Sequence, residues 1–242
     1  MFHRFSRMFS ILRTDFCMEG AGRSNRAAFY RSFLLPPDVP LRHSRSGRPA
    51  HNLNDSDTMT KSKEWKVLDS EYLFDRPWLT VRRERIGLSN GHVIPEYYVL
   101  EYPDWVNTLA VTKDGRFLFV RQYRHGLGET CYELCAGVRD PGDASPLDAA
   151  RRELWEETGY GNGTWREWMV ISANPSTQTN LTYCFLATDV EPVSTQHLEP
   201  SEELTVHLLT REQVLGLLLG DRIKQSLHAA PLWKYAAENH WL

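Results

Sequence analysis

Short runs of alternating or continuously apolar residues, separated by turn-forming residues, begin near Trp65. Residues 80–88 and 92–102 are typical of two β-strands, and Ser89-Asn90-Gly91 lies between them, where Asn-Gly strongly favours a hairpin. A small antiparallel sheet is therefore expected first. Further strands are expected at residues 105–112, 116–123, 129–137, 182–190 and 204–209, the first two joined by the turn Lys113-Asp114-Gly115.

The clearest helix signal covers residues 146–158. Ser145 has the position of an N-cap, Pro146 suits the first helical residue, and Asp148 takes the acidic place of a capping box. Gly159 follows the last turn, where a glycine usually ends a helix. These signals predict a helix of about thirteen residues with defined ends.

Two more helices are expected near the end of the chain. One opens at Thr210 and ends near Gly220, and the other covers roughly residues 223–238, where Pro231 places its continuity in question. Strands before, between and after a few helices indicate an α+β fold, a mixed α/β/α sandwich with a small antiparallel sheet at its N-terminal side.

Residues 1–58 differ from the rest in composition. They are rich in Arg, Ser, Pro and Asn and carry a net charge of +4, which leaves −7 for residues 59–242 within an overall −3. We expect an unstructured leader there, followed by a sheet subdomain at 59–103 and a main domain at 104–242. The first twelve residues resemble a basic amphipathic presequence, which would indicate mitochondrial targeting, but we favour upstream sequence ahead of a usable start at Met59.

Composition excludes several classes of protein. The mean hydropathy is −0.47, and the longest aliphatic run lies near Leu217–Leu219, far short of a membrane span. The four cysteines include no C-x-x-C pair, so a reducing compartment, the cytoplasm, is expected. The acidic body disfavours nucleic acid as a partner and leaves room for a site that collects cations.

Acidic residues cluster on one side of the predicted helix at 146–158. Leu147, Ala150 and Leu154 form an apolar stripe, and three glutamates occupy the adjoining surface: Glu153, Glu156 and Glu157. Carboxylates at this spacing repel one another, and a cation would convert the repulsion into binding energy. Oxygen ligands favour Mg²⁺ or Mn²⁺, ions that are commonly shared with substrate phosphates.

The segment GVRDPGDASPLDAARRELWEETGY, residues 137–160, closely resembles the Nudix box, G-x5-E-x7-R-E-U-x-E-E-x-G-U with U aliphatic. Two departures lie before the helix: Asp143 replaces the first glutamate, and eight residues rather than seven separate it from the arginine. The resemblance implies the Nudix fold and a divalent metal site. The matching positions are Arg152, Glu153, Leu154, Glu156, Glu157 and Gly159, with Tyr160 at a U position.

The preceding stretch VRQYRHGLGETCYELCAG, residues 120–137, resembles the ADP-ribose pyrophosphatase branch, with Cys135 in place of the usual proline. This likeness implies a metal contact by the backbone carbonyl of Ala136, a phosphate contact by Arg124, and a substrate-site role for Glu133. A surface salt bridge is the structural alternative for Arg124, and pairing with an arginine is the alternative for Glu133. The branch also implies a homodimer formed through the N-terminal sheet, with Trp78 as a stacking platform for the base or as an ordinary core or interface residue.

The resemblance implies a Mg²⁺-dependent hydrolase that cleaves ADP-ribose to AMP and ribose 5-phosphate, with Arg152 and Glu156 in the catalytic set. The general base is expected in the acidic loop HLEPSEEL, at Glu202 before Glu199 or Glu203, although such a loop is also typical of a solvated turn. Two alternatives stay open. One is a hydrolase of another nucleotide sugar such as GDP-mannose, and the other is a non-catalytic Nudix-fold ligand sensor.

Overall fold

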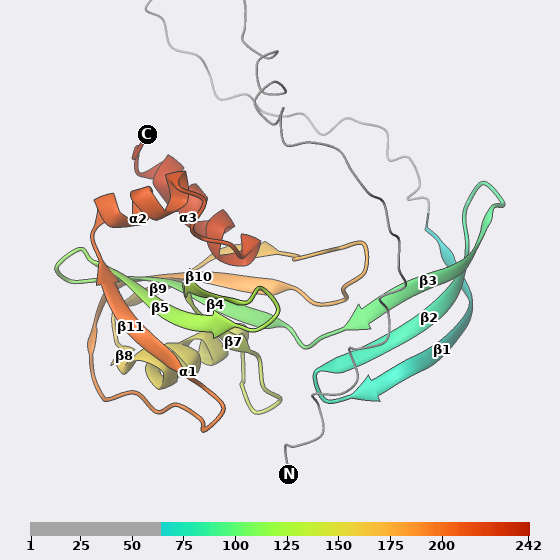
Figure 1. Ribbon diagram of the computed structural model, residues 1–242, viewed down its shortest axis with the longest axis horizontal. Coiled ribbons are helices and arrows are strands. Elements are labelled where there is room, and N and C mark those ends of the chain that lie inside the picture. Colours follow the sequence, from blue (N-terminus) through green and yellow to red (C-terminus); the bar gives the residue numbers. More distant parts are fainter. Residues whose placement is uncertain (1–63) are drawn as a thin grey trace, which may run out of the picture. The chain divides into compact units, whose positions relative to one another are not determined.

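The computed structural model describes residues 64–242, which form two β-sheets and three α-helices (Figure 1). The predicted leader, residues 1–58, lies outside the described residues. No helix of the described part is long and apolar enough to cross a membrane. The elements are β1 (Lys66–Arg76), β2 (Leu79–Gly87), β3 (Val93–Glu101), β4 (Trp105–Thr112), β5 (Phe117–Arg124), β6 (Glu129–Glu133), β7 (Cys135–Val138), α1 (Pro146–Thr158), β8 (Tyr160–Gly161), β9 (Thr164–Ile171), β10 (Thr182–Pro192), β11 (Leu204–Leu209), α2 (Arg211–Leu219) and α3 (Ser226–Glu238).

The first sheet is antiparallel, in the order β1-β2-β3. The predicted hairpin turn joins β2 to β3, with Gly91 at φ +86°, in the left-handed region that glycine adopts without steric cost. Strand β1 was not predicted. All eleven of its side chains are exposed, so its sequence lacks the regular alternation that burial of one face imposes.

The second sheet is mixed, with the path β11-β5-β4-β10-β8. Strands β4 and β10 pair in parallel, whereas the other pairs are antiparallel, and β9, which was not predicted, flanks β10. The single strand predicted at 129–137 is wrong. It breaks at Leu134 into β6, which pairs with β5, and β7, which pairs with β4, because β4 and β5 share only two register pairs and then separate.

Helices cover both faces of this mixed sheet, with α1 on one side and α2 and α3 on the other (Figure 1). Successive side chains along each strand point to opposite faces of the sheet, so the same strands contribute to the hydrophobic cores on both faces. Leu109 and Phe119 belong to the cluster beneath α2 and α3, whereas the neighbouring Ala110 and Leu118 pack in the cluster with Leu154 of α1. The predicted α/β/α sandwich with a small antiparallel sheet is therefore confirmed.

The predicted ends of α1 and α2 are correct, including the capping box of α2 at Thr210. Helix α3 begins at Ser226 and not at Ile223, which is buried but lies in the preceding loop. Pro231 stays within α3 although it lacks the amide that would bond the carbonyl of Leu227. The side-chain amide of Asn107 donates to that carbonyl at 2.8 Å and replaces the missing donor.

Candidate active site

Helix α1 is fixed by its caps and by its apolar side. The hydroxyl of Ser145 accepts a bond from the Asp148 amide at 3.2 Å, and Gly159 ends the helix at φ +73°. Ala150 and Leu154 are fully buried against the sheet. Because the three glutamates adjoin this buried side, the helix turns them toward β7 rather than into bulk solvent.

Burial perturbs two of these glutamates. Glu157 is 6% exposed and accepts a hydrogen bond from the amide of Ala136 at 3.2 Å. Loss of water, with a smaller contribution from the nearby Glu153 carboxylate, raises the pKa of Glu157 to about 8. Burial likewise raises the pKa of Glu153 to about 7. Two carboxyl groups that resist ionisation so close together form a site to which a cation would bind favourably.

Gly137 allows β7 to approach these carboxyl groups closely. A Cβ atom at this position would overlap the carboxyl group of Glu153, so only a residue without a side chain leaves that group in place. The glycine that opens the predicted box therefore has a steric reason to be there.

We expect Gly137→Ala to fold with near-normal stability, because the end of the Glu153 side chain can rotate away. The rotation would displace a carboxylate, so the Mg²⁺ concentration for half-maximal hydrolysis should rise by about tenfold. A metal titration of activity measures this, and melting temperature serves as the control for folding. An unchanged metal requirement would contradict the placement of Glu153.

Arg152 holds the acidic groups in position. Its guanidinium donates to both carboxylate oxygens of Asp143, at 3.1 and 3.0 Å, and to Glu153 and Glu156, each at 2.9 Å. A fourth partner is the carbonyl of Val138 at 3.0 Å. Arg152 also lowers the pKa of Asp143 through these bonds. The aspartate that departs from the family motif thus reaches the arginine despite the extra loop residue.

The arrangement fits a partial metal site. Within residues 64–242, no three His, Cys, Asp or Glu side chains are grouped closely enough to hold an ion by themselves. Mg²⁺ usually retains several waters and takes one or two protein carboxylates together with substrate phosphates. The buried pair Glu153 and Glu157 supplies oxygen ligands of this kind, and phosphate and water would complete the set.

The raised pKa values predict how metal-free protein responds to pH. Between about pH 4.5 and pH 8 the native state binds more protons than the unfolded state, so the free energy of unfolding falls as pH rises. In chelator, we expect a melting temperature several degrees lower at about pH 8.5 than at about pH 6. Calorimetry tests this. Mg²⁺ should restore stability at the higher pH, and an equal pH dependence in Glu157→Gln would contradict the assignment to this site.

The acidic loop after β10 is fastened to the end of α1. The amide of His197 donates to the carbonyl of Glu156 at 2.8 Å, the Gln196 side chain donates to the carbonyl of Glu157 at 2.6 Å, and the His197 ring stacks on Trp155 at 4.2 Å. These bonds hold the loop beside the helix that carries the glutamates.

Of the three predicted base candidates, the structure brings Glu202 to the carboxylate cluster. Glu202 is half-buried, and its charge contributes to the raised pKa of Glu153 and Glu157. The Glu199 amide donates to the Glu202 carboxylate at 3.0 Å. Glu199 and Glu203 are exposed. Glu202 is therefore the candidate whose charge reaches Glu153 and Glu157, and its role as the base stays a prediction.

Arg124 and Glu133 lie together. The guanidinium of Arg124 donates to Glu133 through Nε at 2.8 Å and through a second nitrogen. The Glu133 side chain is 2% exposed, and that of Arg124 is 42% exposed. Both line a cavity of about 750 Å³ that also reaches Ala136 and Gly137. This cavity therefore adjoins the strand that faces the glutamates.

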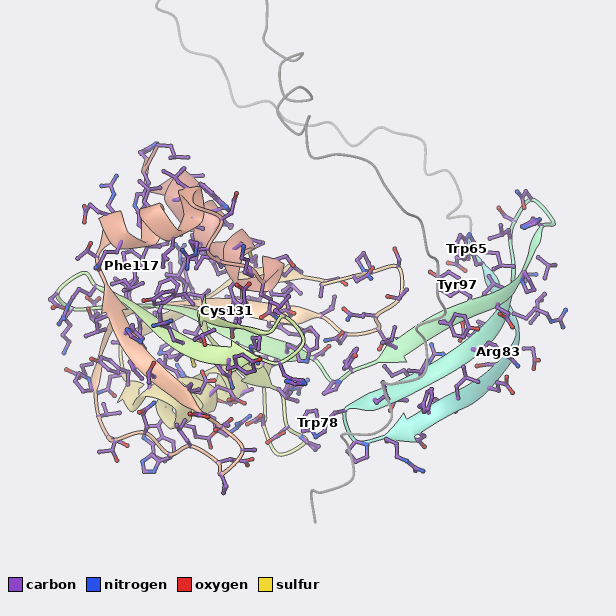
Figure 2. The ribbon with its side chains drawn as sticks, viewed as in Figure 1. Trp65, Trp78, Arg83, Tyr97, Phe117 and Cys131 are labelled. Atoms are coloured by element: carbon purple, nitrogen blue, oxygen red, sulfur yellow. The ribbon has the colours of Figure 1, made fainter. Side chains whose placement is uncertain are left out.

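Trp78 is not among the residues that line the cavity. It occupies the turn between β1 and β2 at φ +69°, with 77% of its surface exposed (Figure 2). The indole ring is therefore not buried in the hydrophobic core, and the alternative that Trp78 is an ordinary core residue is wrong.

Three buried polar side chains that line the cavity were not predicted as site residues: Asn107, Thr182 and His228. Asn107 and Thr182 lie on predicted strands, and His228 lies on the third helix, so each resembles ordinary buried structure in the sequence. Their convergence depends on the parallel pairing of β4 with β10, which no local pattern indicates.

Comparison with known proteins agrees with this geometry. The NUDIX domain model matches residues 102–229, and the model for a nucleoside diphosphate sugar hydrolase N-terminal domain matches residues 65–100. An ADP-ribose pyrophosphatase of Bacillus subtilis (strain 168) is 30% identical over 159 residues, which cover 65% of this chain and 85% of the relative. An ADP-ribose pyrophosphatase of Mycobacterium tuberculosis is 28% identical over 130 residues, 54% of this chain and 62% of the relative.

The crystal structure of an ADP compounds hydrolase has the same fold, with a TM-score of 0.64 and 23% sequence identity, covering 73% of this chain and 96% of that one. The NUDIX domain model matches more than half of this chain. The matched residues include the buried glutamate pair on α1 and the glycine of β7 that faces it. The chain belongs to the Nudix family and is a Nudix hydrolase. The family and branch predicted from the motif are confirmed.

Proposed function

We propose that this protein hydrolyses the diphosphate bond of a nucleoside diphosphate linked to a second group, with ADP-ribose as the substrate and AMP and ribose 5-phosphate as the products. The observation that carries the proposal is the buried pair Glu153 and Glu157, with raised pKa values, beside a strand that also lines a cavity of about 750 Å³. A cavity of that size suits a nucleotide-sized ligand. The ADP-ribose pyrophosphatase relatives support the choice of substrate.

Glu153, Glu156 and Glu157, with the carbonyl of Ala136, would hold Mg²⁺, and Mn²⁺ has suitable chemistry as well. When bound, the ion would neutralise diphosphate charge and lower the pKa of a coordinated water. Arg152 would act as a positioning residue, because its donors are already engaged by three carboxylates and a carbonyl.

The remaining steps use this chain's own side chains. Glu202 would accept the proton of the attacking water, since it is the base candidate that lies near the glutamates. Arg124 would offset phosphate charge from the exposed side of its guanidinium while Glu133 orients it. The protein's share in this reaction is chiefly positioning and charge compensation.

We also propose a homodimer formed through the first sheet, with Trp78 stacking on the substrate base. Exposed apolar side chains on this sheet favour coverage by a second copy. A cytoplasmic location is part of the proposal, because the three cysteines of the described residues are buried and unpaired. The exposed apolar residues include Val67, Leu68, Tyr72, Leu73, Phe74 and Leu79.

A panel of nucleotide sugars tests the substrate. The full chain is incubated with Mg²⁺ and each compound, and phosphate is measured after a phosphatase that acts only on the released monophosphates. We expect the highest kcat/KM with ADP-ribose. Rapid turnover of GDP-mannose without turnover of ADP-ribose would overturn the substrate assignment. Tight binding of ADP-ribose with no turnover of any compound would indicate a ligand sensor.

A further inference from the structure

The cavity beside β7 has an uncharged polar floor. Asn107, Thr182 and His228 are each at most 2% exposed and all line this cavity. Four of their polar atoms find no hydrogen-bond partner within residues 64–242: Asn107 Oδ1, Thr182 Oγ1, and both ring nitrogens of His228, whose Nε2 lies 3.7 Å from a Glu133 carboxylate oxygen, beyond hydrogen-bond distance. Buried polar atoms without partners are unfavourable, so several of them on residues that line one cavity indicate a ligand that satisfies them.

The strand register explains why these side chains meet. In the parallel pair of β4 and β10, Thr182 lies opposite Trp105, and Asn107 is two residues further along β4 on the same face. The first turn of α3, which carries His228, approaches this face, as the bond from Asn107 to Leu227 shows. The three groups therefore come from three different elements and line one cavity.

Pro231 explains the orientation of the Asn107 amide. Because the proline cannot donate to the carbonyl of Leu227, the Asn107 Nδ2 takes that role at 2.8 Å. The orientation of the amide is thereby determined, and Oδ1 is left as an acceptor. The proline within α3 thus leaves the Asn107 Oδ1 as an unpaired acceptor on a residue that lines the cavity.

The chemistry of the floor is mixed and neutral. An amide oxygen accepts, a threonine hydroxyl both donates and accepts, and burial lowers the pKa of His228 to about 4, so its imidazole offers one donor and one acceptor. Beside it the charged pair Arg124 and Glu133 is internally compensated, and Lys224 is the other charged residue that lines the cavity. A phosphate, which only accepts, would leave the acceptors of this floor unsatisfied, whereas hydroxyl groups match both kinds of partner.

We propose that Asn107, Thr182 and His228 hydrogen-bond the hydroxyl groups of the sugar in the group linked to the diphosphate, and so select a polyhydroxylated group at that end of the substrate. The proposal rests on the proposed function of the neighbouring glutamates. It makes these three residues specificity determinants rather than catalytic ones. The three side chains come from β4, β10 and α3, so they reach the ligand from different directions. The hydroxyl groups of a sugar point in several directions, whereas the polar groups of a base lie along the edge of a flat ring.

Thr182→Val tests this proposal, because valine keeps the shape and removes the hydroxyl. Kinetics are measured with ADP-ribose and with the β-methyl ester of ADP, which has the same adenosine and diphosphate but lacks the second sugar and its hydroxyl groups. We expect kcat/KM for ADP-ribose to fall by about tenfold and that for the methyl ester to stay within about twofold. Thr188→Val, on the same strand and outside the cavity, is the matched control and should change neither value.

Other outcomes overturn the proposal. An equal loss with both substrates would indicate contact with the base or phosphates, and no loss with either would indicate a structural role. His228→Phe provides a second variant, which keeps a ring and removes both nitrogens, and the same selective loss is expected.

If the wild-type chain hydrolyses neither compound, the proposed function fails, and calorimetric titration with ribose 5-phosphate tests the floor separately. Binding that weakens in Thr182→Val supports the proposal. Equal binding by both proteins, or none by the wild type, overturns it.

Discussion

Glu157→Gln is expected to lower turnover by at least about 10³-fold while the protein remains folded. The glutamine keeps an oxygen that can accept the bond from the Ala136 amide, so the local contact of α1 with β7 survives. What is lost is the carboxylate charge that Glu157 would offer to a bound cation next to Glu153. The reduction follows because the site would bind a divalent ion less tightly and would stabilise less of the charge that develops on the diphosphate.

Steady-state hydrolysis and Mn²⁺ binding by electron paramagnetic resonance measure the two consequences together. Glu167→Gln, an exposed position on β9, is the matched control and should match the wild type in both. Normal turnover by Glu157→Gln would refute the assignment of this helix to metal binding. Lost turnover with unchanged Mn²⁺ affinity would refute Glu157 as a ligand.

Arg124→Met is expected to lower the free energy of unfolding by about 2 kcal/mol, or the melting temperature by about 6 °C. Removal of the guanidinium leaves the buried Glu133 carboxylate without its charge partner. His228 lies 3.7 Å from Glu133, but its lowered pKa keeps it neutral near pH 7 and unable to compensate. The half-exposed position of Arg124 lets water reach the pair and moderates the loss.

Glu133→Leu combined with Arg124→Met separates stability from function. Because an apolar pair can replace a buried ion pair with little loss, the double variant should recover most of the stability. We expect its KM for ADP-ribose to remain raised by about tenfold, since the phosphate partner is still absent. Thermal unfolding and kinetics measure both quantities. A double variant with normal stability and normal KM would show that the pair is only structural.

Helix α1 could be predicted with correct ends because its signals are local. The N-cap Ser145 and the terminating Gly159 act through their own backbone geometry, and the positions of the glutamates follow from helical periodicity. Local turn chemistry likewise identified Asn90-Gly91. The same reasoning placed the start of α3 too early, because Ile223 is buried by tertiary packing and not by a helix.

The cavity floor could not be predicted, since it depends on contacts distant in sequence. Asn107 meets Leu227 across 120 positions, and the parallel pairing of β4 with β10 has no sequence signal of its own. The pairing of Arg124 with Glu133 was considered only as an alternative for each residue separately. Their position nine residues apart on antiparallel neighbours becomes clear only when β5 and β6 are seen to pair.

Product analysis tests the central claim most directly. The full chain is incubated with ADP-ribose and Mg²⁺ in ¹⁸O-labelled water, and a parallel reaction contains a chelator. The products are separated, and their masses are measured by mass spectrometry. We predict AMP and ribose 5-phosphate in equal amounts, one of them carrying a single ¹⁸O atom, and no products in chelator. Intact ADP-ribose in the presence of Mg²⁺, or equal cleavage in chelator, would contradict the account.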